Sequence, residues 1–226
     1  MFDLRIFLDA LLGAALFKGA LLTIGLALLV QVATLFIGVC LAQMTRSGRR
    51  ALRWPARIYV WIFRAAPALL VLLVVWNGLP QLFPIFRQSW YSPFLAAFIG
   101  LTLVQSAYAA EIIRAAIGAV PHGQTEAATA LGLSRFKTQA LVVMPQAFRI
   151  ALPPLSNEFI ALLKATSLAT VIALKELMTV TQYAIAASFR FLEWYAAALV
   201  YYLVLVAVIS AVQGVVEGRL ERAYRR

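Results

Sequence analysis

Charged residues inside long apolar stretches are the first feature of this 226-residue chain that could do chemistry. A charge in apolar surroundings must be paired, must reach polar solvent, or must serve a function such as binding a polar solute or relaying a proton. The residues of this kind are Arg64, Glu111, Arg114, Glu158 and Lys164. They predict either a polar path through an apolar protein or ion pairs that stabilise its helices.

Two of these charges have a spacing that predicts a pair. Glu111 and Arg114 are three residues apart, so on one helix their side chains lie next to each other and favour a structural salt bridge. We expect Arg64 to snorkel, which means that its aliphatic stem extends along apolar surface and its guanidinium reaches polar surroundings.

Glu158 is the preferred contact for a solute. Asn157 and Glu158 follow Pro153-Pro154, where a broken helix would expose polar groups to a water-filled path. The carboxylate suits an ammonium or guanidinium group of a solute, and an ion pair with a basic residue elsewhere in the protein is the open alternative. Further candidates for the lining of the path are Lys164 and Ser167 on the same segment, and Gln105 and Tyr108 on the preceding apolar segment.

Metal and redox chemistry find little support in the sequence. Cys40 is the only cysteine, so the chain can form neither an internal disulfide nor a cysteine-based metal cluster. His122 is the only histidine, which excludes a site built on a pair of histidines and disfavours a hydrolase triad. We expect no metal site, no catalytic residue, and a turn or capping role for His122.

The composition is that of an integral membrane protein. Hydrophobic residues make up 63% of the chain and charged residues 13%, about half the charged fraction of soluble domains. The net charge of +11 does not indicate nucleic-acid binding, because the basic residues are scattered between apolar stretches.

The sequence predicts an all-α membrane protein that forms a single domain over residues 1–226. A helix needs about 20 apolar residues to cross a bilayer. Residues 2–16 are too short for this and predict an interfacial helix. The five segments that are long enough are 19–43, 57–79, 93–117, 150–174 and 193–216.

The basic residues also predict an orientation. Twelve of them lie in residues 46–57, 135–149 and 219–226, whereas five lie in the segments that would face the other side. Arginine and lysine accumulate on the cytoplasmic side of membrane proteins. The amino terminus is therefore expected outside and the carboxyl terminus inside, with the 118–149 loop in the cytoplasm.

The 118–149 loop carries a spaced pattern. Glu126, Ala127 and Ala128 are followed after three residues by Gly132, and after nine more by a Val-Val-Met-Pro run that ends at Pro145. This pattern resembles the EAA loop of the permease subunits of ABC importers. The segment FRAAPALL at 63–70 resembles the family's Arg-Gly-Thr-Pro-Leu-Leu segment. Two further segments resemble the branch that transports polar amino acids and opines: YAAEIIRAAIGAVPHGQTEAATALGLS at 108–134 and LPPLSNEFIALLKATSLATVIALKEL at 152–177.

The resemblance implies that this loop forms a coupling helix that docks on an ATPase. Glu126 would start the helix, face a basic residue of the partner and be stabilised by the helix dipole. Ala127 and Ala128 would keep the contact surface flat. Gly132 would end the helix in a turn, and Pro145 would redirect the chain toward the fourth span.

The resemblance further implies a membrane-spanning subunit of an ATP-driven importer in the inner membrane of a bacterium. The chain contains no GxxxxGK[ST] sequence, so ATP and Mg²⁺ would bind a separate pair of ATPase subunits. Other expected partners are a second permease copy or a sister subunit, an external solute-binding protein, and membrane lipid. The alternatives are an ion-gradient-driven carrier or channel, with Glu111, Arg114 and Glu158 as an ion relay, and a purely structural membrane subunit that would tolerate Gly132→Asp.

Overall fold

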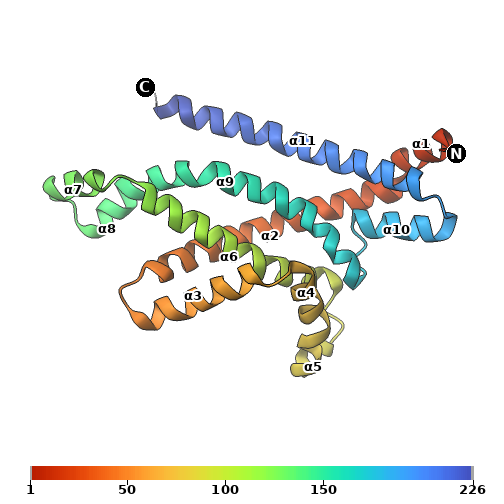
Figure 1. Ribbon diagram of the computed structural model, residues 1–226, viewed down its shortest axis with the longest axis horizontal. Helices are drawn as coiled ribbons and strands as arrows, with labels where there is room; N and C mark the ends of the chain where they lie inside the picture. Colours follow the sequence, from red (N-terminus) through yellow and green to blue (C-terminus); the bar gives the residue numbers. More distant parts are fainter. Residues whose placement is uncertain (1, 225–226) are drawn as a thin grey trace.

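The computed structural model describes residues 2–224, with side chains up to residue 219, and every element in this part is helical (Figure 1). Four stretches are long and apolar enough to span a membrane, and a bent pair of helices brings the number of candidate spans to five. The prediction of an all-α protein with five spans is therefore confirmed. The four single stretches are Ala14–Arg46, Pro93–Ala119, Arg135–Ile172 and Phe191–Arg219.

The amino-terminal segment forms the short helix α1 (Leu4–Leu12), as predicted for residues 2–16. The Asp3 carboxylate caps it by accepting hydrogen bonds from the amides of Arg5 and Ile6. Helix α1 packs against the start of the last helix, α11 (Phe191–Tyr224), where the amide of Asp3 donates to the Glu193 carboxylate. This hydrogen bond and the packing hold α1 against the start of α11.

The second span is not the single helix expected over 57–79. Helix α3 (Arg50–Ala65) ends at Ala66–Pro67, and the chain continues at an angle of 107° into helices α4 and α5. Proline has no amide hydrogen and forces the preceding residue into extended backbone, which here is Ala66. After the bend follow α4 (Ala68–Leu73), a π-helical turn (Val74–Gly78), α5 (Leu79–Leu82) and a 3₁₀ turn (Pro84–Arg87).

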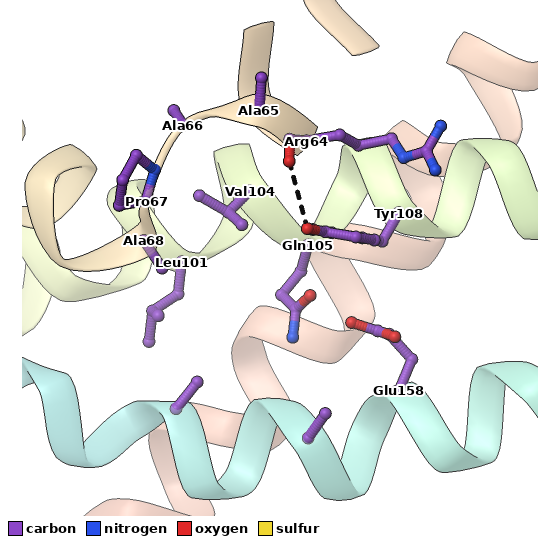
Figure 2. Close-up of a pocket in the computed structure, with 12 residues that line it drawn as sticks. Arg64, Ala65, Ala66, Pro67, Ala68, Leu101, Val104, Gln105, Tyr108 and Glu158 are labelled. Carbon is purple, nitrogen blue, oxygen red and sulfur yellow. Dashed lines mark hydrogen bonds between the residues drawn. The ribbon is translucent and has the colours of Figure 1, made fainter. Parts of the chain in front are cut away.

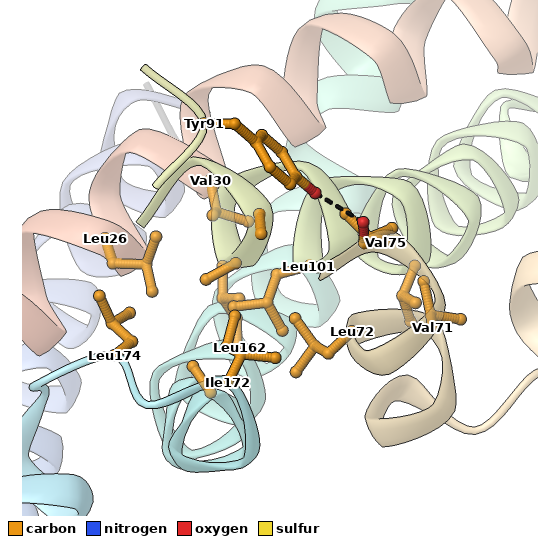
Figure 3. Packing of buried hydrophobic residues seen from close by; sticks show 14 residues of the cluster. Leu26, Val30, Val71, Leu72, Val75, Tyr91, Leu101, Leu162, Ile172 and Leu174 are labelled. Atoms are coloured by element: carbon orange, nitrogen blue, oxygen red, sulfur yellow. Dashed lines mark hydrogen bonds between the residues drawn. The ribbon is translucent and has the colours of Figure 1, made fainter. Parts of the chain in front are cut away.

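The third span, α6 (Pro93–Ala119), is the centre of the bundle. It lies between α2 (Ala14–Arg46) and α9 (Met144–Ala165) and packs against both (Figure 1). Leu101 of α6 meets Leu72 of the bent span and Leu162 of α9 in the largest buried cluster (Figure 3). The middle of the bundle therefore joins the bend to the third and fourth spans.

The fourth span is longer than the predicted 150–174 and is not broken. Helix α8 (Arg135–Lys137) passes through a π-helical turn (Thr138–Val143) into α9, and a 3₁₀ stretch (Thr166–Ile172) ends it. Pro145 is the second residue of α9 and does not redirect the chain, because the wider π turn just before it accommodates a residue without an amide hydrogen. Pro153-Pro154 also lie inside α9 and cause no break.

A short helix between the fourth and fifth spans, α10 (Leu177–Ser188), has no counterpart in the sequence prediction. Ala173, in the left-handed region at φ 58°, turns the chain, and the buried Glu176 carboxylate caps the helix. The amide of Leu177 donates to the Thr23 hydroxyl of α2. Helix α10 is therefore fixed at its first residue to the first span.

Candidate solute cavity and coupling loop

A cavity of about 420 Å³ lies where the bend of the second span faces α6 and α9 (Figure 2). The volume lies within the usual range of small-molecule sites, about 300–1,000 Å³. Polar side chains enter from three elements, and apolar side chains, most of them small, form the remaining wall. The lining comprises Arg64, Ala65, Ala66, Pro67, Ala68, Leu101, Val104, Gln105, Tyr108, Glu158, Ala161 and Ala165.

Three predicted path residues meet in this cavity. Gln105 and Tyr108 lie on α6, and Glu158 faces them from α9, with the Gln105 amide as a hydrogen-bonding neighbour of its carboxylate (Figure 2). The Tyr108 hydroxyl donates to the backbone carbonyl of Arg64 at 3.3 Å. Within residues 2–219, Glu158 takes part in no salt bridge. Glu158 therefore has no salt-bridge partner in the described part of the chain, although Arg64 lines the same cavity.

The other predicted path residues do not reach this cavity. Asn157 and Lys164 are exposed on a neighbouring face of α9, and the Ser167 hydroxyl donates to the Lys164 carbonyl at 2.7 Å. A helix turns by about 100° per residue, so Asn157 cannot share the direction of Glu158. The sequence assigned all these residues to one path, and only the packing of α9 in the bundle shows which face of this helix lines the cavity.

Sequence reasoning also missed the contribution of residues 64–68. The bend at Pro67 interrupts the helix next to the cavity, so backbone and small side chains of this segment form one wall (Figure 2). Irregular backbone at membrane depth occurs where it lines a cavity or is covered by protein. Pro67 within an apolar stretch was the signal that could have found this wall.

Glu111 holds a pair of arginines beside the cavity. Its carboxylate accepts from Nε and a terminal nitrogen of Arg114 at 3.0 and 2.9 Å, which confirms the predicted i,i+3 pair. Arg64 also approaches Glu111, at 3.5 Å, and its guanidinium carbon lies 5.8 Å from the centre of the Tyr108 ring. Arg64 is thus an ion-pair partner and not a lone snorkelling side chain.

The predicted helix and turn of the 118–149 loop are present. Helix α7 (His122–Ala130) ends in a turn at Gly132, whose φ of 77° belongs to the left-handed region that favours glycine. The amides of Leu131 and Leu133 donate back to the carbonyls of Ala127 and Ala128, which closes the end of the helix. The chain then enters α8 beside α7 (Figure 1).

Glu126 and the two alanines do not all lie as predicted. Helix α7 begins at His122, so Glu126 is in its second turn and gains little from the helix dipole, which acts mainly in the first turn. Glu126 and Ala127 are exposed, but Ala128 is buried against the following helical segment. Ala128 therefore does not contribute to the outer surface of α7.

Large apolar side chains are exposed on the same loop. Leu131 is 83% exposed and Phe136 is 81% exposed, on either side of the Gly132 turn. Leu131 precedes the Arg135–Ile172 stretch and Phe136 is its second residue, so both lie at or outside the end of the fourth span. Exposed apolar side chains next to a charged group are typical of a surface that binds another protein.

The comparisons with known proteins agree with this geometry. The family model described as the binding-protein-dependent transport system inner membrane component matches residues 34–222. The arginine transport system permease protein ArtQ of Bacillus subtilis (strain 168) is 36% identical over 205 residues, which cover 90% of this chain and 91% of ArtQ. The octopine transport system permease protein OccM of Rhizobium radiobacter is 37% identical over 213 residues, which cover 90% of this chain and 86% of OccM.

A solved structure has the same fold. The crystal structure of an amino acid ABC transporter with histidines contains a chain that is 32% identical and superposes with a TM-score of 0.83, covering 91% of this chain and 94% of that chain. The family match spans most of the sequence and includes the coupling loop and the cavity. The chain thus belongs to the family of inner membrane components of binding-protein-dependent transport systems, the non-catalytic membrane subunits of ABC importers whose ATPase is a separate partner.

Proposed function

We propose that this subunit forms the path for a polar amino acid or opine that carries a cationic group, and that Glu158 binds that group. The observation that carries the proposal is the Glu158 carboxylate, which lines the cavity without a salt bridge inside residues 2–219. A charge at membrane depth is costly unless it is paired, so a cationic solute would supply the missing partner. Gln105 and Tyr108 would orient the polar part of the solute.

The names of the related permeases support this class of solute. One relative is named for arginine and another for octopine, and both align with about nine tenths of this chain. Arginine carries a guanidinium group, which a carboxylate binds with charge-assisted hydrogen bonds. The cavity has room for a single solute of this size.

The coupling loop would bind the ATPase pair, which would hold ATP and Mg²⁺. Glu126 would face a basic residue of the ATPase, and Leu131 and Phe136 would contribute apolar contacts. Closure of the ATPases would then rock the helices between outward-open and inward-open states. A second permease copy or sister subunit would complete the path, and an external binding protein would deliver the solute.

The proposed orientation places the amino terminus outside and the carboxyl terminus inside. Figure 1 shows the α2–α3 hairpin, the coupling loop and the far end of α11 at one end of the bundle, and α1 with α10 at the other. The first end carries most of the basic residues. By the rule that positive charge stays inside, this end would face the cytoplasm.

The deciding experiment compares Glu158→Gln with the wild type in proteoliposomes that contain the complete importer and its binding protein. Labelled arginine, octopine and glutamine are supplied outside, with ATP inside. We expect the variant to lose uptake of arginine and octopine, the two solutes with a guanidinium group, by at least about tenfold, which corresponds to the loss of one good charged contact. Asp9→Asn, an exposed acid-to-amide change at the other end of the chain, is the matched control and should transport normally.

Three outcomes would overturn the proposal. Unchanged arginine uptake by Glu158→Gln would remove the solute role of this carboxylate. If the wild type takes up glutamine but neither arginine nor octopine, the solute is not one whose guanidinium binds Glu158. If uptake continues without ATP and stops when an uncoupler is added, the protein is an ion-gradient-driven carrier and not part of an ATP-driven importer.

A further inference from the structure

The hairpin between the first two spans concentrates positive charge in a part of the sequence that has no acidic residue. Helix α2 ends at Arg46, α3 begins at Arg50, and five arginines fall within residues 46–57: Arg46, Arg49, Arg50, Arg53 and Arg57. No aspartate or glutamate occurs between Asp9 and Glu111 in the sequence. Within the described side chains, none of the five arginines forms a salt bridge. We call residues 46–57 the basic hairpin.

The arginines of α3 form a row on one side of the helix. At 100° per residue, Arg50, Arg53 and Arg57 lie within about 60° of one another. Arg49, Arg50 and Arg57 are exposed, whereas Arg53 is half-buried. The Nε atom of Arg53 is buried and has no hydrogen-bond partner in the described part of the chain. A donor in this position calls for an acceptor from outside the chain.

Exposed apolar side chains run alongside this row. Trp54 is 60% exposed and Trp61 is 72% exposed, and Ile58 lies exposed between them. The opposite face of α3 packs on the bundle through the buried Ala56 and Val60. Tryptophan favours the boundary between lipid tails and headgroups. The arginines beside Trp54 therefore lie at the level of the lipid phosphates.

We propose that the basic hairpin binds the phosphate groups of anionic phospholipids. Arg50, Arg53 and Arg57 supply guanidinium groups that match phosphate oxygens, and Arg53 Nε donates to one of them. Trp54 and Ile58 contact the acyl chains of the same lipids. Anionic headgroups offset the mutual repulsion of five close cations, which zwitterionic headgroups do less well.

Lipid fits this surface better than the ATPase does. The coupling loop extends farther from the bundle than the basic hairpin does (Figure 1). The exposed apolar face of α3 continues from Trp54 along the helix to Trp61, which is the direction of the membrane interior and not of a cytosolic protein. The proposal does not depend on which solute is transported.

The test measures lipids retained by the purified full importer with native mass spectrometry. The complex is exchanged into equal amounts of phosphatidylglycerol and phosphatidylcholine. The wild type should retain phosphatidylglycerol with a preference of about fivefold or more, and Arg49→Gln/Arg50→Gln/Arg57→Gln should lose most of this preference. The charge-matched control Arg5→Gln/Lys18→Gln/Lys175→Gln changes three exposed basic residues elsewhere and should keep it.

Each remaining outcome decides against the proposal. Equal loss of preference in the control variant would show an effect of net charge alone. Displacement of phosphatidylglycerol by millimolar inorganic phosphate would identify a site for free phosphate. A preference that appears only after the ATPase subunits are removed from the complex would identify a protein contact. Where the triple variant does not fold, Arg50→Gln and Arg57→Gln singly must each lower the preference, and unchanged preference in both rejects lipid binding.

Discussion

The guanidinium of Arg64, the last arginine before the bend of the second span, lies 3.5 Å from the carboxylate of Glu111 on the third span. The same carboxylate holds Arg114 at 2.9 Å. Glu111 therefore fixes the end of α3 to α6 immediately beside the cavity. Because one anion serves two cations, its loss leaves two arginines that repel each other.

We expect Glu111→Gln to destabilise the protein more than Arg114→Gln does. The two arginines are almost half exposed, so water screens the pairs and the effect should be about 0.5–1 kcal/mol. The double variant Glu111→Gln/Arg64→Gln should be more stable than the sum of the single changes predicts. Thermal unfolding in detergent for the full cycle measures this coupling, and strict additivity would contradict it.

Glu126→Lys should abolish co-purification of the ATPase without unfolding the membrane subunit. Glu126 is exposed on α7, so its replacement leaves the fold intact but places a cation opposite the proposed basic residue of the partner. The measurement is the ratio of ATPase to permease after affinity purification. Asp9→Lys makes the same charge change on the exposed surface of α1 and should retain the ATPase.

Phe136→Ser tests the apolar part of the same surface. The ring is 81% exposed, so its removal should not lower the melting temperature of the isolated subunit. Loss of an apolar contact at the centre of an interface costs about 1–3 kcal/mol, which corresponds to a weakening of ATPase binding by about fivefold to about 150-fold. Unchanged binding would place the ATPase elsewhere on the loop.

The effect of replacing Gly132 should depend on how readily the new residue adopts a positive φ, and not on the size of its side chain. Its φ is 77° and a Cβ added to it would meet no atom within 4 Å, so only conformational strain opposes a side chain. Asn should be mild, Ala should cost about 1 kcal/mol, and Val should cost more. Uptake and ATPase binding should fall in that order, whereas Gly123→Ala in the open first turn of α7 should have no effect.

The sequence predicted what depends on composition and on spacing along one helix. Long apolar stretches sufficed to find the spans, and i,i+3 spacing sufficed to pair Glu111 with Arg114. The turn at Gly132 followed from the one residue type that adopts positive φ without strain. Each of these features is local, so no tertiary contact was needed to infer it.

Features that depend on contacts between segments were missed or wrong. Nothing near Pro145 in the sequence shows that a π-helical turn accommodates it, and nothing near Glu158 shows which face of α9 lines a cavity. Helix α10 was missed because its anchor, the hydrogen bond from Leu177 to Thr23, joins residues far apart in the chain. The ion pair of Arg64 was missed because its partner, Glu111, lies on another span.

Gly38 should not tolerate any larger residue, whereas Gly25 on the same helix should accept one. A Cβ at Gly38 would lie 2.9 Å from the Cβ of Ala109, where the first span meets α6 at the centre of the bundle. A Cβ at Gly25 would meet no atom within 4 Å. Gly38→Val should destabilise by about 1–3 kcal/mol through overpacking. The melting temperatures of Gly38→Val and Gly25→Val give the comparison, and equal values would contradict close packing at Gly38.

Glu176, a residue that no sequence pattern singled out, should make stability depend on pH. Its side chain is fully buried at the start of α10 and accepts hydrogen bonds from the amides of Met178 and Thr179. Burial raises the pKa of the Glu176 carboxyl, and these hydrogen bonds only partly oppose the increase. The Tyr202 hydroxyl also lies 3.4 Å from the carboxylate.

A carboxyl whose pKa is raised by folding binds more protons in the folded state than in the unfolded state. Its contribution to stability is therefore greatest below the unfolded pKa and is lost as the pH rises through the folded pKa. Glu176→Gln keeps one acceptor oxygen without a titrating charge. Relative to the wild type, the variant should become progressively more stable as the pH rises from about 4 to about 7. Thermal unfolding of both proteins across this range measures the difference, and a constant difference would show that Glu176 keeps the same protonation state in the folded and unfolded chain.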